Sequence, residues 1–240
     1  MDPEYALKYR EIYNQHWWWR AREKLILSTI AKIQPKGSQG SILDIGCGDG
    51  LLFDRLSAFG EVEGVEMDGS LVSATSRWKD RIYLCSFDDS FEPGKQYSLI
   101  LMLDVLEHFS DPRPPLRRAL ALLEQQGILL ITVPAFPCLW TSHDELNRHF
   151  TRYTKRTFSQ LAKEAGMRID CCRYFFHWTF PLKLLIRIKE AFSYTSPHTP
   201  KVPPRWINAV LYKFSILEQR FFHLLPLPFG TSLISLGSKR

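Results

Sequence analysis

The chain has 240 residues, of which 45% are hydrophobic and 23% are charged. This is the composition of a globular protein, and the length suffices for one substantial core, so we expect a single domain over residues 1–240. The formal net charge of +6 suits a nucleic acid, an anionic membrane surface or an acidic substrate, and it does not choose among them.

The cysteines argue against disulfides and against zinc. The chain has five of them, so one is left over, and no two are spaced as CxxC. Most lie in or beside strand-like runs, which favours buried thiols in a reducing compartment. We therefore expect no metal site; the five residues are Cys47, Cys85, Cys138, Cys171 and Cys172.

The sequence predicts neither a secretory signal nor a membrane span. Met1 is followed at once by two acidic residues and a proline, unlike the start of a signal peptide. The two long uncharged stretches, Gln125–Ser142 and Phe221–Ser238, contain prolines that argue against continuous helices. We expect a cytoplasmic protein, with association to a membrane surface left open.

The chain begins with a helical pattern over Glu4–Gln34 that is interrupted near His16–Trp19. Beyond it, strand-like runs alternate with helical patterns at Gly50–Phe59, Ser70–Trp78 and Pro114–Gln125. This alternation predicts parallel strands joined by right-handed crossovers, with helices on both faces of one sheet. The predicted strands are Ser41–Ile45, Val62–Glu66, Ile82–Cys85, Ser98–Leu103, Gly127–Val133, Arg168–Phe175 and Thr231–Gly237.

About fifty residues, from His177 to Pro228, separate the last two predicted strands. They contain two helical patterns, Pro181–Phe192 and Pro204–Leu225, joined by the proline-rich connector Ser196–Pro204. We therefore expect a helical insertion over residues 177–228.

The most informative motif follows the first predicted strand, where the chain reads Asp44-x-Gly46-x-Gly48-x-Gly50. Alternating glycines after a strand let the backbone turn sharply and bring amide N–H groups close to a ligand. A dinucleotide-binding loop would place its third glycine one residue later, at Leu51. The loop instead resembles motif I of the class I S-adenosylmethionine-dependent methyltransferases.

Glu66 ends the second predicted strand, sixteen residues past the glycine loop. A carboxylate at this place can accept hydrogen bonds from both ribose hydroxyls of an adenosine, and Met67 would then line the adenine pocket. After the third strand, Ser86 and Phe87 occupy the place where such enzymes usually contact adenine. Ser86 stands where an acidic residue is common, and Phe87 is explained equally well as a core residue.

The fourth predicted strand is followed by Asp104-Val105-Leu106-Glu107-His108, which resembles the DVLEH signature of the type 11 group within class I. In relatives, the backbone near Asp104 meets the methionine end of the cofactor. His108 could cap or shield the site, although a lone histidine is more often structural.

The resemblance runs from Ser41 to about Gly166 and implies a Rossmann-like α/β fold. Its doubly wound, seven-stranded sheet would be mostly parallel, with the last strand antiparallel. The resemblance also implies S-adenosylmethionine as cofactor, S-adenosylhomocysteine as product, and an in-line displacement that needs chiefly close and aligned approach. The expected cofactor-binding residues are Asp44, Gly46, Cys47, Gly48, Gly50, Glu66, Met67, Ser86, Phe87, Asp104 and Val105.

Polar residues crowd the stretch after the fifth predicted strand. Leu139–Thr154 resembles a run, LW..HD....H.RRYT, of one bacterial subset of these enzymes, with Thr151 where an arginine is usual. Within it, Arg152 and Asp144 could simply hold a lid by an ion pair.

A general base is needed only if the acceptor arrives protonated. We rank His149 first and His143 second for this role, and Tyr153 is a further catalytic candidate.

Trp17, Trp18 and Trp19 cannot all face one core, because neighbours on a helix point about 100° apart. One ring could stack near the sulfonium and another could close the acceptor pocket. An amphipathic helix packed on the sheet would explain one or two of the three. We expect residues 1–36 to form an amino-terminal helical lid.

The insertion carries seven basic and two acidic residues between 177 and 228, most of the excess charge of the chain, and it is rich in Leu, Ile and Phe. Basic, apolar helices suit an interfacial membrane contact, and they equally suit a lid over a lipid-like acceptor or a homodimer interface. No nucleic-acid partner is expected, since no single basic stripe is evident.

Three functions remain open. The leading one is methylation of a small or lipid-linked acceptor, with O- or N-methylation favoured. The second is a cofactor-binding protein of the same fold that transfers no methyl group, such as a cyclase. The third is a peripheral membrane scaffold with a vestigial cofactor site, which the intact glycines and Glu66 argue against.

Overall fold

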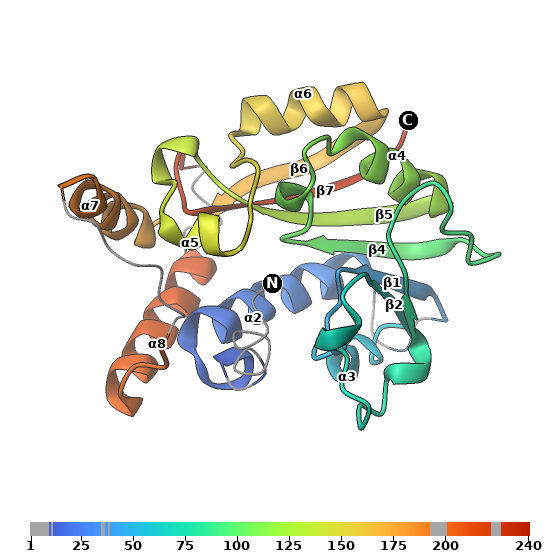
Figure 1. Ribbon diagram of the computed structural model, residues 1–240, viewed down its shortest axis with the longest axis horizontal. Helices are drawn as coiled ribbons and strands as arrows, with labels where there is room; N and C mark the ends of the chain where they lie inside the picture. The colour runs from blue at the N-terminus through green and yellow to red at the C-terminus, as the bar shows by residue number, and fades with distance from the viewer. Residues whose placement is uncertain (1–9, 11, 35–36, 38, 193–200, 222–226) are drawn as a thin grey trace.

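The computed structural model describes residues 10, 12–34, 37, 39–192, 201–221 and 227–240. Its strands are β1 (Ser41–Ile45), β2 (Glu61–Glu66), β3 (Ile82–Leu84), β4 (Tyr97–Leu103), β5 (Leu123–Pro134), β6 (Met167–Phe175) and β7 (Ser232–Lys239). They form one sheet in the order β3-β2-β1-β4-β5-β7-β6 (Figure 1).

The pairing of the strands confirms the predicted fold class. The first five strands pair in parallel, and β7 pairs antiparallel with both β5 and β6. Because β6 is antiparallel to β7, it runs in the same direction as the first five. The sheet is therefore mostly parallel with its last strand reversed, as expected of the Rossmann-like methyltransferase arrangement.

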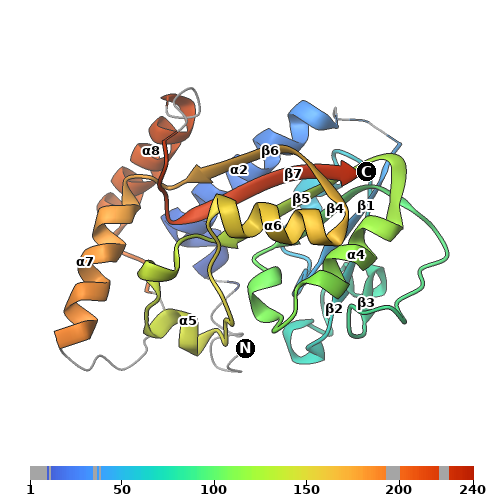
Figure 2. The same cartoon turned by 90° about the horizontal axis from the view of Figure 1, so that it is seen from above.

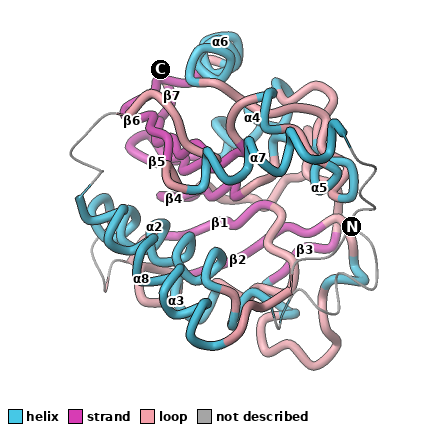
Figure 3. The backbone as a smooth tube through the Cα atoms, turned by 90° about the vertical axis from the view of Figure 1, so that its left-hand side faces the viewer, coloured by secondary structure: helices cyan, strands magenta, loops and turns pink. Residues whose placement is uncertain are grey.

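Helices cover both faces of this sheet. Figure 3 shows α4 and α6 on one side and α2 and α3 on the other. Two separate groups of buried apolar side chains correspond to these two sides, one including Leu116 and Phe158 and the other including Ile26 and Phe53. The helices are α2 (Trp17–Ile33), α3 (Phe53–Leu56), α4 (Arg113–Leu122), α5 (Ser142–Leu146), α6 (Lys155–Ala165), α7 (Thr179–Phe192) and α8 (Arg205–Phe221).

Two predicted helices were wrong. The pattern over residues 50–59 yields only the short α3, and the pattern over 70–78 yields the end of a 3₁₀ helix at Gly69–Leu71 followed by turns over 72–78. In the second region, Asp49 Oδ1 accepts from the backbone N–H of Ser73, and Ser73 Oγ accepts from that of Thr75. Such local side-chain bonds satisfy the backbone without a helix.

The described part of the insertion between β6 and β7 contains α7 and α8, which confirms its two predicted helices as far as Phe192 and Phe221. Figure 2 places these helices together at one end of the sheet. Most of the predicted connector, residues 196–200, lies outside the described residues. Helix α8 packs on α2, and its Asn208 both donates to the carbonyl oxygen of Gln15 and accepts from the N–H of Trp17. Helix α7 instead contacts the start of α5, where Glu190 accepts from the backbone N–H and the hydroxyl of Ser142.

Among the helices that the structure describes, none combines the length and the apolar character needed to cross a bilayer.

A close contact beneath the first strand's loop gives a test of the fold. Gly64 of β2 lies under Cys47, and a Cβ at this position would overlap Cys47 Sγ and lie 2.7 Å from Phe53 Cζ. We expect Gly64→Ala to destabilise the protein by about 1–3 kcal/mol, because overpacking forces the neighbours to move. Thermal unfolding followed by circular dichroism measures the loss.

Gly69→Ala is the matched control. A Cβ there would lie 3.9 Å from Leu84 Cδ1, which is an ordinary contact distance. Equal melting temperatures for the two variants would contradict the packing described for Gly64.

Candidate active site

The glycine loop lies at the carboxyl end of β1 and adopts the conformation that its glycines allow. Gly46, Gly48 and Gly50 have φ angles of +71°, +54° and +69°, in the left-handed region that disfavours other residues. A Cβ at Gly46 would lie 2.9 Å from Val105 Cγ2, so the loop approaches the turn after β4 closely. At Gly48 a Cβ would meet nothing within 4 Å, so the backbone there faces open space. These two features fit a cradle for a ligand.

Glu66 stands at the end of β2, beside this loop. Its Oε2 accepts from the N–H of Gly48 and its Oε1 from the N–H of Asp68, both at 2.9 Å. Each carboxylate oxygen has further acceptor capacity, so the group can still receive two ribose hydroxyls. Met67 is 75% exposed next to it, a position suited to covering an adenine ring.

The two residues predicted to contact adenine after β3 lie in different surroundings. Ser86 is exposed, whereas Phe87 is 7% exposed and packs against Phe91 with ring centroids 5.6 Å apart. Phe87 therefore occupies the core, which was the alternative explanation for it, because an aromatic ring gains more from burial than from a place at the sheet edge.

A buried ionic network joins the strand ends to α2. Arg22 Nη2 lies 2.8 Å from Asp104 Oδ2 and donates to Thr132 Oγ1, which donates to Asp104 Oδ1 at 3.0 Å. Asp104 has a φ of +60°, so the backbone turns sharply where the methionine end of the cofactor is expected. Burial raises the pKa of Asp44 to about 7, and the positive charge of Arg22 opposes this shift. The sequence did not single out Arg22, because one arginine in a helix carries no sign of a partner 82 residues away.

The predicted catalytic residues after β5 are organised around Asp144, which is fully buried in α5. Its carboxylate accepts from Arg152 Nε at 2.8 Å and Nη2 at 3.0 Å, from Thr141 N at 2.9 Å, and bonds Nδ1 of His149 at 2.9 Å. Burial alone would raise the pKa of Asp144, but the bond from His149 and the charge of Arg152 hold that pKa well below its usual range. The suggested ion pair between Asp144 and Arg152 is present, and it also fixes the His149 ring.

The other two catalytic candidates are engaged elsewhere. His143 bonds the side-chain amide of Asn147 through Nε2, and burial lowers the pKa of the His143 ring to about 4. The Tyr153 hydroxyl donates to the carbonyl oxygen of Leu106, and burial raises the pKa of Tyr153. Of the three predicted catalytic residues, His149 alone joins the group described next.

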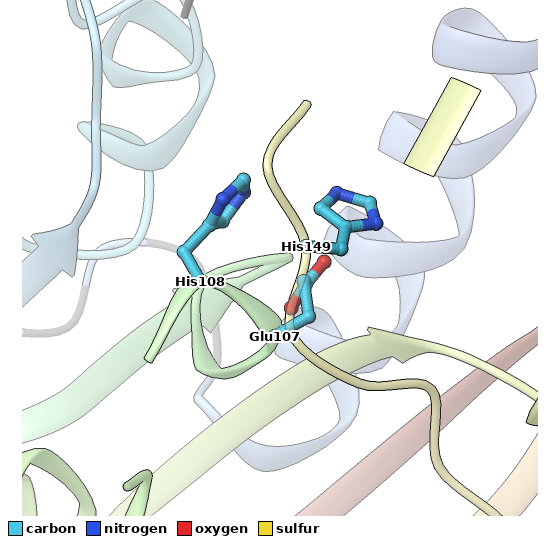
Figure 4. Close-up of side chains that lie close together, drawn as sticks. All are labelled: Glu107, His108 and His149. Carbon is cyan, nitrogen blue, oxygen red and sulfur yellow. The ribbon is translucent and has the colours of Figure 1, made fainter. Parts of the chain in front are cut away.

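Glu107, His108 and His149 come together from two segments, the turn after β4 and the loop after α5 (Figure 4). One donor atom from each lies within 4.8 Å of the others, and the two imidazole rings meet edge to face with centroids 4.8 Å apart. Glu107 is fully buried, and burial, with the nearby charge of Asp104, raises its pKa well above the usual range. The sequence analysis missed Glu107, although the second acid of the DVLEH run was the available signal.

Helix α7 also reaches this side of the sheet. Burial, followed by the charge of Arg152, lowers the pKa of Lys183 to about 8, and Asp144 acts on Lys183 in the opposite direction. No sequence pattern connected this lysine of the insertion with the site.

The three tryptophans at the start of α2 are divided between two packing environments. Trp17 and Trp18 both contact the ring of Phe176, at centroid distances of 6.2 and 5.6 Å. Trp19 packs with Ile12 and Tyr13 instead. Two environments therefore share the three rings, as helix geometry requires, and their contacts are those of packing.

Comparison with known proteins agrees with this geometry. A family model described as "Methyltransferase domain" matches residues 18–171. A ubiquinone biosynthesis O-methyltransferase of Bradyrhizobium diazoefficiens is 32% identical over 97 residues, and this match spans only 38% of either chain.

Solved structures resemble the chain over nearly its whole length. One comes from the complex between the Haloferax volcanii Trm112 methyltransferase activator and a methyltransferase, with a TM-score of 0.61, 16% identity, and coverage of 98% of this chain and 94% of that one. Another is the [4+2]-cyclase SpnF, with a TM-score of 0.55, 15% identity and coverage of 92% and 82%. At such identities these likenesses establish the fold.

The family model covers more than half of the chain, the sheet has the matching topology, and the glycine loop and Glu66 fit an adenosyl group. The chain therefore belongs to the methyltransferase domain family, as a class I member whose cofactor is S-adenosylmethionine.

Proposed function

We propose that this protein transfers a methyl group from S-adenosylmethionine to a hydroxyl oxygen of a small or lipid-like acceptor. The observation that carries the proposal is that one turn, after β4, joins the two halves of the site. Its Val105 lies close to the glycine loop that bonds Glu66, and its Glu107 and His108 lie beside His149. A relative named as a ubiquinone biosynthesis O-methyltransferase supports oxygen as the methylated atom.

The cofactor would supply a methyl group on a positively charged sulfonium. For its binding, Glu66 would accept from the ribose hydroxyls, and the backbone of Gly46–Gly50, which lies beside Glu66, would line the same site. The remaining roles are those expected from the sequence: Asp104 and Val105 at the methionine end, and Asp44, Cys47, Met67 and Ser86 around the nucleoside.

The amino-terminal segment is proposed as a cover for this site. Arg10 forms an ion pair with Asp49 of the glycine loop, and Leu51 packs against the group that contains Tyr13. Exclusion of water by such a cover favours attack by the acceptor alone.

His149 is proposed to act at the acceptor hydroxyl. Asp144 bonds Nδ1 of its ring, so Nε2 is the nitrogen through which His149 can interact with another group. The Arg152–Asp144 ion pair holds this arrangement in place before the acceptor arrives.

The ribose contact is tested by Glu66→Gln. The side-chain amide of Gln has one acceptor oxygen and no charge, whereas the carboxylate of Glu66 offers two charged acceptor oxygens to the ribose hydroxyls. We therefore expect the affinity for S-adenosylhomocysteine to fall at least about tenfold, which is the size of effect that loss of a hydrogen bond to a charged group has on binding. Isothermal titration calorimetry measures the affinity. Glu61→Gln, an exposed change at the other end of β2, is the control, and equal affinity in the two variants would refute the assignment.

Methyl transfer itself is tested with cofactor labelled in the methyl group. Incubation with a cell lipid extract should give a labelled product that is one methyl heavier, detected by mass spectrometry. Binding of S-adenosylhomocysteine without any labelled product would instead support the non-methylating, cyclase-like alternative.

On the product found, His149→Ala should lower kcat about 10²-fold or more, because activation of the acceptor is lost. Glu145→Ala, an exposed change in α5, is the control. Full turnover by His149→Ala would show that this residue does not act on the acceptor.

We also propose that the insertion binds an anionic membrane surface. Most α7 residues are exposed, Lys183 being partly buried toward the site, and the exposed apolar residues lie beside basic ones, which is the composition of an interfacial helix. Helix α8 adds Trp206, Val210, Phe214, Leu217 and Phe221 to the exposed apolar residues.

The double variant Leu185→Glu/Ile188→Glu tests the membrane proposal. It places negative charge on the exposed face of α7, so flotation with phosphatidylglycerol-containing vesicles should be lost, while Lys163→Glu in α6 should float as the wild type does. Unchanged flotation of the double variant would contradict the proposal. If the wild type does not bind vesicles but sediments as a dimer, and the double variant sediments as a monomer, the exposed face of α7 is a homodimer interface instead.

A further inference from the structure

The buried carboxylate of Glu107 has no structural explanation in the fold. It is fully buried, and neither of its oxygens has a hydrogen-bond partner among the residues that the structure describes. A polar group buried without a partner costs free energy, so native proteins nearly always satisfy such groups with protein, water or an ion. Glu107 therefore indicates a ligand at this position.

The two nearest polar side chains are both imidazoles. Donor atoms of Glu107, His108 and His149 lie within 4.8 Å of one another, close enough for small movements to bring all three onto one ion. Two nitrogen donors and one carboxylate suit a transition metal such as zinc, iron(II), manganese or cobalt, whereas calcium and magnesium prefer oxygen ligands throughout.

The surroundings of His149 are those of a metal ligand. In metal sites, the ligating histidine typically bonds a carboxylate through its other ring nitrogen, which fixes the orientation of the ring. Asp144 bonds Nδ1 of His149 in this way and is itself held by two bonds from Arg152. The bond from Asp144 leaves Nε2 as the nitrogen directed to an ion.

We propose that Glu107, His108 and His149 bind one divalent transition-metal ion on the acceptor side of the active site. Three protein ligands leave at least one coordination position open. This revises the expectation of no metal site, which was drawn from cysteine spacing and did not consider this group.

The role of the ion rests on the proposed methyl transfer, although its binding does not. An ion held there would lower the pKa of an acceptor hydroxyl at the open position. The proton of that hydroxyl would pass to solvent, and its oxygen would form a bond to the methyl group as the bond from that methyl group to sulfur breaks. His149 then acts on the acceptor by holding the ion.

Titration of the full-length, chelator-treated protein with Co²⁺ tests the binding. Visible absorption and calorimetry should both saturate at one Co²⁺ per chain. Glu107→Gln, His108→Asn and His149→Asn should each weaken Co²⁺ binding by at least about tenfold. Asp144 is a positioning residue, and Asp144→Asn should weaken it by about 10–100-fold while leaving the ligands in place.

His143→Asn is the matched control, because His143 lies in the same segment but outside the group, and its Co²⁺ affinity should equal that of the wild type. Circular dichroism and S-adenosylhomocysteine binding verify the fold of each variant. If Glu107→Gln fails to fold, the exposed His108 decides the outcome.

Absence of stoichiometric Co²⁺ binding by the wild type, or unchanged affinity in the folded ligand variants, would overturn the metal site. Methyl transfer is measured separately on the same samples. Co²⁺ binding without methyl transfer would refute the proposed function and support the metal site. Methyl transfer without Co²⁺ binding would support the proposed function and refute the metal site.

Discussion

The ion pair between Arg22 and Asp104 joins the first described helix to the strand ends on which the site is built. The guanidinium also bonds Thr132 of β5, so α2, β4 and β5 meet at one buried charge. Arg22 is buried whereas Asp104 is partly exposed, so loss of Asp104 would leave a buried guanidinium with one fewer partner. The amino-terminal helix is therefore tied to the ends of β4 and β5, and it cannot move away as a whole without breaking these bonds.

Asp144 joins several segments on the side of the proposed acceptor, as Asp104 does at the ends of β4 and β5. One carboxylate caps α5 through Thr141, pairs with Arg152 and orients His149. Such prior ordering matters for catalysis, because groups that need no rearrangement at the moment of reaction lower the barrier most. The two carboxylates thus fix the donor and acceptor sides independently.

Much of the fold could be predicted from local patterns, and the candidate cofactor site was proposed from its motifs. The apolar run before Gly46 predicted β1 with its observed bounds, and the alternation of elements predicted the parallel pairing of the first five strands. Local patterns failed where side chains satisfied the backbone, as at Ser73, and where a ring was buried, as at Phe87. Arg22 and Glu107 could not be found in this way, since their significance comes from partners that only the folded chain brings near.

The insertion enters the chain between β6 and β7, at the end of the sheet remote from β1 and β2. Its helices contact α2 and the Ser142 turn, whereas the glycine loop and Glu66 belong to the opposite half of the chain. The glycine loop and Glu66 are thus encoded by one stretch of sequence and the insertion by another, and the two stretches are joined by β4, β5 and β6. Substitutions in α7 and α8 can therefore accumulate while the glycine loop and Glu66 stay intact, so the surface of the insertion can change in evolution without altering that half of the chain.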